Sequence, residues 1–179
     1  DPMVVDVYDQ GMGTKISGYP SALVDRGADI DPGVIDGDFM QRITEAPDAV
    51  LTNGASLDDD TTSIAISVTT KFNQNITGDW RLVCVLTEDG IQRDSTGYAQ
   101  SNAYANNSNG PMGGYENLPS KVPASQMVYD HVAREIYGGV NGEPGSLPSI
   151  LEAGETYSYS FSIFILTSSQ RANFILLIR

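Results

Sequence analysis

The sequence predicts a mainly β protein, an antiparallel β-sandwich that follows a short segment of mixed helix and strand. Three stretches carry this prediction. Large apolar side chains alternate with serines over residues 157–165, apolar and polar side chains alternate over residues 64–72, and residues 80–89 form an apolar run closed by Gly90. Alternation is typical of a strand with one buried face, and a short apolar run of a strand buried on both. Strands without long helices between them favour two antiparallel sheets packed face to face.

Near the start of the chain, Tyr19-Pro20 introduces an apolar segment that runs to Arg26. Proline lacks the N–H that strand pairing uses, so it heads a strand only at a sheet edge or in a special turn. Two interpretations of Pro20 stay open: an ordinary turn, and a cis Tyr19–Pro20 bond of a kind that is rare elsewhere.

A short amphipathic helix is predicted over residues 39–46, where Phe39, Met40 and Ile43 recur at helical spacing; one face should pack and the other should be wet. Residues 16–26, followed by a helix near residues 33–46 whose start lies near Pro32, resemble the strand, cis-proline, strand and helix in the C-terminal half of thioredoxin-like folds. The strand and helix that carry the paired redox cysteines in such folds have no counterpart here. The resemblance therefore implies a partial thioredoxin-like segment, with Pro20 as its cis-proline candidate.

A domain boundary is predicted at residues 52–60, where the composition changes to strands separated by Gly, Asn, Pro and Ser. It divides the chain into a partial thioredoxin-like segment, residues 1–52, and a β-sandwich domain, residues 58–179. Within the second part, residues 73–79 are rich in turn-forming side chains, so residues 62–89 are predicted to form a hairpin.

Composition excludes several classes of function. Ten basic and 23 acidic residues give a formal net charge of -13, which repels nucleic acids and anionic lipids. The single cysteine, Cys84, permits neither an internal disulfide nor a cysteine-cluster metal site. The chain shows no export signal and no apolar run long enough for a membrane span. Because it starts abruptly at Asp1 and stops in the apolar residues 174–179, we expect a processed or incomplete chain.

A long loop is predicted over residues 93–150, which show no strong periodicity and are rich in Asn, Ser, Gly and Tyr. Loops of this length in compact domains are usually functional or disordered. Two interpretations of the loop tyrosines stay open. They could form an aromatic platform for a glycan or a peptide, or they could pin the loop to the sandwich. The tyrosines concerned are Tyr98, Tyr104, Tyr115 and Tyr129.

The only histidine, His131, lies in this loop near Arg134, and the acids Glu88 and Asp89 end the predicted central strand. If the two segments run side by side, acid and imidazole meet. Ion pairs that hold the loop to the strand end are the favoured interpretation. A catalytic dyad is a second one. A metal site that also uses Asp130 is a third, but one imidazole with scattered carboxylates is weak evidence, so we predict no metal.

Four short motifs carry a family resemblance. They are Glu88-Asp-Gly-Ile91, Gln100 with Tyr104, Asp130-His-Val-Ala-Arg134 and Gly138-Gly-Val-Asn-Gly142. These motifs resemble the core of the twenty-eight-kilodalton outer-membrane protein family of Bacteroidetes-type bacteria, whose members often combine a thioredoxin-like half with a C-terminal β-sandwich. The sequence departs from that pattern at Asp130, where the family usually has Asn. The resemblance implies a lipid-anchored or surface-associated protein of the outer membrane, cell surface or periplasm of a Gram-negative bacterium, and it implies no catalytic residues.

We therefore expect a non-enzymatic cell-envelope module without a cofactor, which binds an envelope protein, a peptide or a glycan through the 93–150 region. Any membrane association would come through a lipid anchor outside this chain. The alternative is an envelope thiol-disulfide protein whose redox-active half lies outside this chain. The binding candidates are Glu88, Asp89, Gln100, Tyr104, His131 and Arg134.

Overall fold

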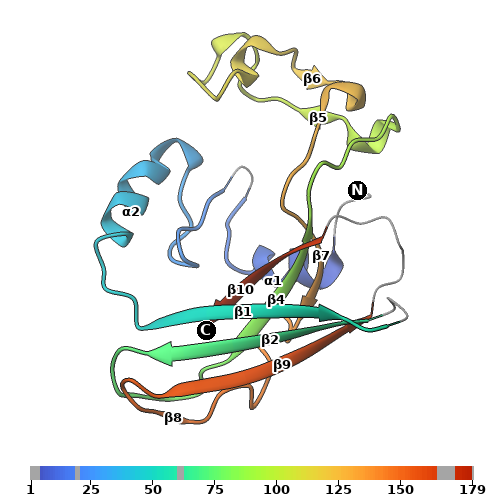
Figure 1. The fold of residues 1–179 in the computed structure, drawn as a ribbon. Helices are drawn as coiled ribbons and strands as arrows, with labels where there is room; N and C mark the ends of the chain where they lie inside the picture. Colours follow the sequence, from blue (N-terminus) through green and yellow to red (C-terminus); the bar gives the residue numbers. More distant parts are fainter. Residues whose placement is uncertain (1–4, 19–20, 60–62, 165–171, 179) are drawn as a thin grey trace.

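The computed structural model describes residues 5–18, 21–59, 63–164 and 172–178, and two three-stranded antiparallel sheets form its body (Figure 1). The prediction of a mainly β protein with antiparallel sheets is confirmed. The first sheet has the order β1-β2-β9, with β1 at Ala49–Leu57, β2 at Ser63–Phe72 and β9 at Thr156–Phe164. The second has the order β10-β4-β7, with β10 at Ala172–Ile178, β4 at Leu82–Glu88 and β7 at Val132–Tyr137.

The two sheets share one apolar core. Phe72, fully buried at the end of β2, packs edge-to-face on Trp80 and Tyr157, with ring centroids 6.3 and 5.9 Å apart. Each fully buried large apolar side chain contributes about 1.5–3 kcal/mol. The alternation predicted for β2 and β9 is confirmed, because the serines between their buried residues are exposed. The core combines Ile64, Ile66, Val68 and Phe72 of β2, Leu82 and Cys84 of β4, and Phe161 and Ile163 of β9 with Leu147 and Leu151.

The predicted hairpin over residues 62–89 is wrong. β2 pairs with β1 and β9, whereas β4 pairs with β10 and β7 in the other sheet. The chain between them forms β3 at Ile76–Thr77, which pairs with β8 at Ile150–Leu151. β4 is buried on both faces along most of its length. A strand of that kind needs cover on each face, which it obtains as the central strand of its own sheet.

Two strands of the three-stranded sheets lie where the sequence analysis predicted none. β7 falls inside the predicted loop 93–150, so that region is not one continuous loop. Its side chains are only partly buried, and a bulge opposite Leu86 and Thr87 shifts its register, which removes a clean alternation. β1 spans the predicted boundary at residues 52–60 and pairs with β2 along its whole length. The division into two domains stays a prediction.

The N-terminal part contains α1 at Asp6–Gly13, a 3-10 turn at Pro32–Val34 and α2 at Ile35–Arg42. α2 lies within the predicted helical range 33–46 and begins four residues before the amphipathic stretch at 39–46. The prediction that one face packs is wrong, because Phe39, Met40 and Ile43 are all more than half exposed. Figure 1 shows the reason: α2 lies beside the loops that precede it, away from both sheets. Among the described residues, no helix has the length and apolar character needed to cross a bilayer.

The thioredoxin-like segment stays a prediction. Residues 21–30 contribute only an isolated bridge between Ala22 and Ile30, and Pro20 lies outside the described residues. The turn at residues 138–142 connects this part to the sheets. Arg26 donates through Nη1 to the carbonyl of Val140 at 3.0 Å, and a Cβ at Gly11 of α1 would collide with the Val140 side chain. Glycine at position 11 therefore lets α1 approach the turn after β7.

Candidate functional site

The pairing of β4 with β7 brings four of the predicted site residues together. Glu88 lies opposite Val132, where β4 ends and β7 begins. Asp89 Oδ1 accepts the backbone N–H of His131 at 2.6 Å and lies 2.8 Å from its ring Nδ1. Arg134 Nε lies 3.3 Å from Glu88 Oε2. The predicted meeting of the strand-end acids with His131 and Arg134 is confirmed, and whether these residues bind a ligand stays a prediction.

His131 has a left-handed backbone, with φ at 58°, and a side chain that is 73% exposed. On the neighbouring residue, Asp130 Oδ1 accepts the N–H of Gly90 at 2.8 Å. Both acids therefore hold backbone N–H groups across the strand pair, an arrangement that closes the end of a ladder. Among the residues that the structure describes, no three His, Cys, Asp or Glu side chains group as a metal site.

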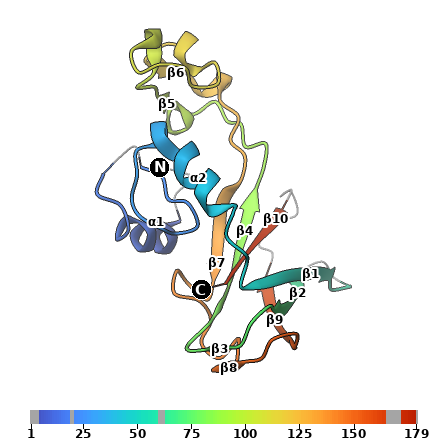
Figure 2. The same cartoon turned by 90° about the vertical axis from the view of Figure 1, so that its left-hand side faces the viewer.

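Beyond this strand end, residues 92–128 form a separate lobe that projects away from both sheets (Figures 1 and 2). Its entry and exit are closed by Ile91 and Tyr129, whose backbones exchange two hydrogen bonds of 3.0 Å. Inside the lobe, β5 at Gln100–Ser101 pairs with β6 at Lys121–Val122. Four 3-10 turns complete it, at Thr96–Tyr98, Ala105–Asn107, Tyr115–Asn117 and Ala124–Gln126.

The buried side chain of Asn102 organises the lobe. Its Nδ2 donates to the carbonyls of Tyr115 at 2.7 Å and Pro119 at 3.2 Å, and its Oδ1 accepts the N–H of Tyr104 at 3.0 Å. The Asn102 side chain thus hydrogen-bonds to backbone groups of two lobe segments that are not paired with each other as strands. A buried side chain with this many backbone partners fixes loop conformation.

A second anchor is Glu116, whose Oε2 accepts the backbone N–H groups of Met112 at 2.8 Å and Gly114 at 2.9 Å. Hydrogen bonds from the backbone N–H groups of Met112, of Glu116 itself and of Gly114 lower the pKa of Glu116 below its ordinary value of 4.5. Asn102 and Glu116 were not among the predicted site residues. An Asn or Glu in a Gly-rich loop is a common turn residue, and only the folded backbone shows which carbonyls and N–H groups it meets.

Gln100 and Tyr104 lie in the lobe, and their hydrogen bonds stay within it. Gln100 Nε2 donates to the carbonyl of Ser101, and the Tyr104 N–H binds Asn102. The loop tyrosines divide between the two interpretations. Tyr129 donates from its hydroxyl to the carbonyl of Tyr98 at 2.7 Å, which fits a pinning role. Tyr115 is 38% exposed, which fits a contact surface.

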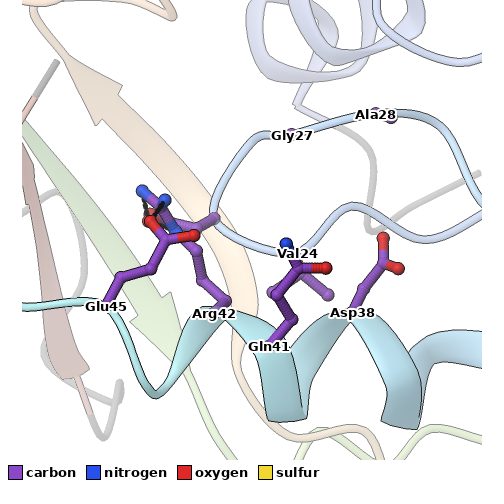
Figure 3. A pocket seen from close by; sticks show the side chains of 8 residues that line it. Val24, Gly27, Ala28, Asp38, Gln41, Arg42 and Glu45 are labelled. Atoms are coloured by element: carbon purple, nitrogen blue, oxygen red, sulfur yellow. Dashed lines mark hydrogen bonds and ion pairs between the residues drawn. The ribbon is translucent and has the colours of Figure 1, made fainter.

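A shallow hollow of about 290 Å³ lies between α2 and residues 24–28 (Figure 3). Arg42 dominates it, with Nη2 2.6 Å from Asp25 Oδ2 and a further ion pair to Glu45. The hydrogen bond that Arg42 donates to Asp25 and the charges of both acids raise the pKa of Arg42. Because these carboxylates already neutralise the guanidinium, the hollow offers no net positive charge to an anion.

Cys84 lies in the core and is fully buried. Burial raises the pKa of its thiol from 9.0 to about 11, so the reactive thiolate is scarce at neutral pH. The sulfur therefore behaves as a small apolar group of β4.

Comparison with known proteins gives one match. The family described as outer membrane protein Omp28 matches residues 8–178, which include both sheets, the lobe and most of the N-terminal part. No curated protein and no solved structure matches the chain.

Proposed function

The chain belongs to the outer membrane protein Omp28 family, which confirms the expected family and the outer membrane location, and from this premise we propose that it is a non-enzymatic binding module. Its lobe, residues 92–128, holds an envelope protein, a peptide or a glycan. A lipid anchor outside this chain would attach the module to the membrane.

One observation carries the proposal: the lobe is built by side chains that hydrogen-bond to backbone. Asn102 and Glu116 hold the loop segments that β5 and β6 do not reach. Glu116 uses a charged acceptor, which makes stronger bonds than a neutral one. A loop ordered before binding loses little conformational entropy when a ligand arrives. Loops held on a rigid scaffold in this way are where binding residues concentrate.

The exposed surface of the lobe suits neutral, hydrogen-bonding ligands. Tyr115 offers a flat amphipathic ring, and the side chains of residues 106–109, Asn-Asn-Ser-Asn, are exposed beside a left-handed turn. Tyr, Ser and Asn supply contact area and adaptable hydrogen bonds at low entropic cost. Peptide backbones and sugar hydroxyls are ligands that such side chains can bind.

The chemistry of the remaining candidates supports binding over catalysis. Asp89 contacts both the backbone and the ring of His131, and this leaves the pair as a strand-end clamp. The thiol of Cys84 is buried and its pKa is raised, which speaks against thiol-disulfide exchange at this residue. No observation on this chain favours the thiol-disulfide alternative over the binding module.

We expect that the lobe can be removed without disturbing the sheets. Ile91 and Tyr129 already form a doubly hydrogen-bonded pair, the geometry that closes a two-residue hairpin. Replacing residues 92–128 by Asn-Gly should therefore give a variant that still unfolds cooperatively. Screening the intact chain and this variant against a glycan array and an immobilised peptide library tests the proposal.

The expected result is a ligand that the intact chain binds and the lobe-less variant does not. Tyr115→Ala should weaken the same binding, and Ile150→Ala should not, because Ile150 is an exposed apolar side chain on β8 in the sandwich. Equal binding by the lobe-less variant, or an intact chain that binds neither library, would contradict the proposal.

A further inference from the structure

β1 is an edge strand whose outer side pairs with nothing among the described residues. Its sheet has the order β1-β2-β9, so only one side of β1 is used (Figure 1). Ala49 and Leu51 pack against the core, but from Thr52 to Leu57 every residue is exposed. Val50 and Leu57 expose 52% and 59% of their surface. The strand thus extends beyond the core as a solvent-exposed ribbon.

The pairing register shows which backbone groups face outward. Asn73 N donates to Asp48 O, and Asp58 N donates to Ser63 O, so the even-numbered residues of β1 exchange hydrogen bonds with β2. The N–H and C=O groups of the odd-numbered residues point away from the sheet. These are Ala49, Leu51, Asn53, Ala55 and Leu57.

β1 lacks the devices that normally protect an edge. Natural edge strands carry charges, proline or a bulge that prevents pairing with another chain. The residues of β1, Ala-Val-Leu-Thr-Asn-Gly-Ala-Ser-Leu, include no charge and no proline, and the β1–β2 register is continuous. Gly54 adds no side chain at the middle of the strand, and a Cβ there would meet nothing within 4 Å.

We propose that β1 binds an extended segment of another polypeptide as an added antiparallel strand. The segment would be uncharged in its middle, with Lys or Arg beside each end. The basic residues follow from charge: Asp48 precedes β1, and Asp58 and Asp59 follow it. In an added strand, the residues beyond its ends come to lie beside these acids, where opposite charges are favourable. Backbone hydrogen bonds would supply affinity, as in other cases of strand addition.

A second copy of this chain fits the edge less well. If two β1 strands paired antiparallel about Asn53, Asp48 of each copy would face Asp58 of the other. Like charges directly opposite each other destabilise a strand pair. The net charge of -13 on each copy adds to the repulsion. The same acids that disfavour self-pairing favour a basic-flanked partner.

A labelled synthetic peptide tests this proposal. The probe is Lys-Lys-Thr-Val-Thr-Val-Thr-Val-Thr-Lys-Lys, and its control carries Glu in place of every Lys. Fluorescence anisotropy with the full chain should show binding of the Lys peptide that is at least about tenfold tighter than that of the Glu peptide, and that weakens as salt is added. Amide exchange at Asn53, Ala55 and Leu57 should slow on binding, because their N–H groups become hydrogen-bonded.

Ala55→Pro removes one outward N–H, and Ala55→Ser is its matched control. The first should weaken peptide binding by about tenfold or more and the second should leave it unchanged. Leu57→Pro repeats the test at the strand end if Ala55→Pro lowers the unfolding temperature. The variant with residues 92–128 replaced should still bind the peptide, which separates this site from the lobe.

Three results would overturn the proposal. One is equal affinity for the Lys and Glu peptides. Another is an Ala55→Pro variant that unfolds normally and binds the peptide as tightly as the original chain. The last is slowed exchange at Asn53, Ala55 and Leu57 without peptide, together with a dimer in analytical ultracentrifugation. This result would show that a second copy of the chain occupies the outer edge of β1.

Discussion

The Oδ1 atom of Asp89 lies 2.6 Å from the backbone nitrogen of His131 and 2.8 Å from its ring Nδ1. Asp89 follows β4, His131 precedes β7, and the contact joins the ends of two paired strands at the base of the lobe. A substitution of His131 removes the ring contact but leaves the hydrogen bond from its backbone N–H to Asp89 in place.

Asp89→Ala should therefore destabilise the protein more than His131→Ala. The first change removes the acceptor of a backbone N–H and should lower the free energy of unfolding by about 1–3 kcal/mol. The second loses only an exposed contact, which is worth about 1 kcal/mol or less. Urea unfolding of both variants measures the difference. Equal losses would show that the ring, not the backbone bond, holds the strand end.

Gly138→Ala should be more costly than Gly139→Ala, although both glycines have positive φ, at 82° and 62°. The left-handed backbone alone costs an alanine about 1–2 kcal/mol. At Gly138 the new Cβ would also collide with the backbone nitrogen of Glu143, whereas at Gly139 it would meet nothing within 4 Å. The difference in unfolding temperature between the two variants measures the cost of the collision. Similar unfolding temperatures would contradict this reading of the turn.

The lobe should loosen in acid because of Glu116. The pKa of Glu116 is lowered by hydrogen bonds to its carboxylate, so its contribution is present above the ordinary value of 4.5 and is lost as the pH falls through the lowered pKa. Amide exchange at Met112 and Gly114 should therefore speed up, after correction for the intrinsic rate, as the pH falls below 4.5. Glu116→Gln, which cannot ionise, should show weak protection at every pH. Protection that does not change with pH in the original chain would contradict the assignment.

Cys84 should make the fold sensitive to alkali. Burial raises the pKa of its thiol to about 11 in the folded state, compared with 9.0 for an exposed thiol. As the pH rises, the unfolded state therefore loses this proton first. The contribution of this thiol to the free energy of unfolding should be constant below pH 9.0 and fall between pH 9.0 and about 11. Cys84→Ala should reduce this fall. Part of it should remain, because burial and Glu135 also raise the pKa of Tyr137. An identical alkaline decline in both proteins would exclude the thiol as a cause.

Periodic segments could be predicted from the sequence, and irregular ones could not. The alternation in residues 64–72 and 157–165 identified β2 and β9, and the apolar run at 80–89 identified β4 as a central strand. β7 and β1 were missed, because side chains at the border of a sheet are only partly buried and carry no strong pattern. The turn-forming residues 73–79, between two strand patterns, predicted a hairpin. The two strands, β2 and β4, belong instead to different sheets.

The sequence by itself determined the mainly β class and the family, and it predicted that the Glu88-Asp89 acids meet His131 and Arg134 if their segments run side by side, which the β4–β7 pairing then decided. These depend on local pattern and on motifs that are read along the chain. Only the tertiary structure decided that Asn102 and Glu116 organise the lobe, that the apolar side chains of α2 stay exposed, and that the outer edge of β1 is unpaired among the described residues. Hydrogen-bond satisfaction and burial depend on which segments meet in space, and local patterns along the chain do not reveal those meetings.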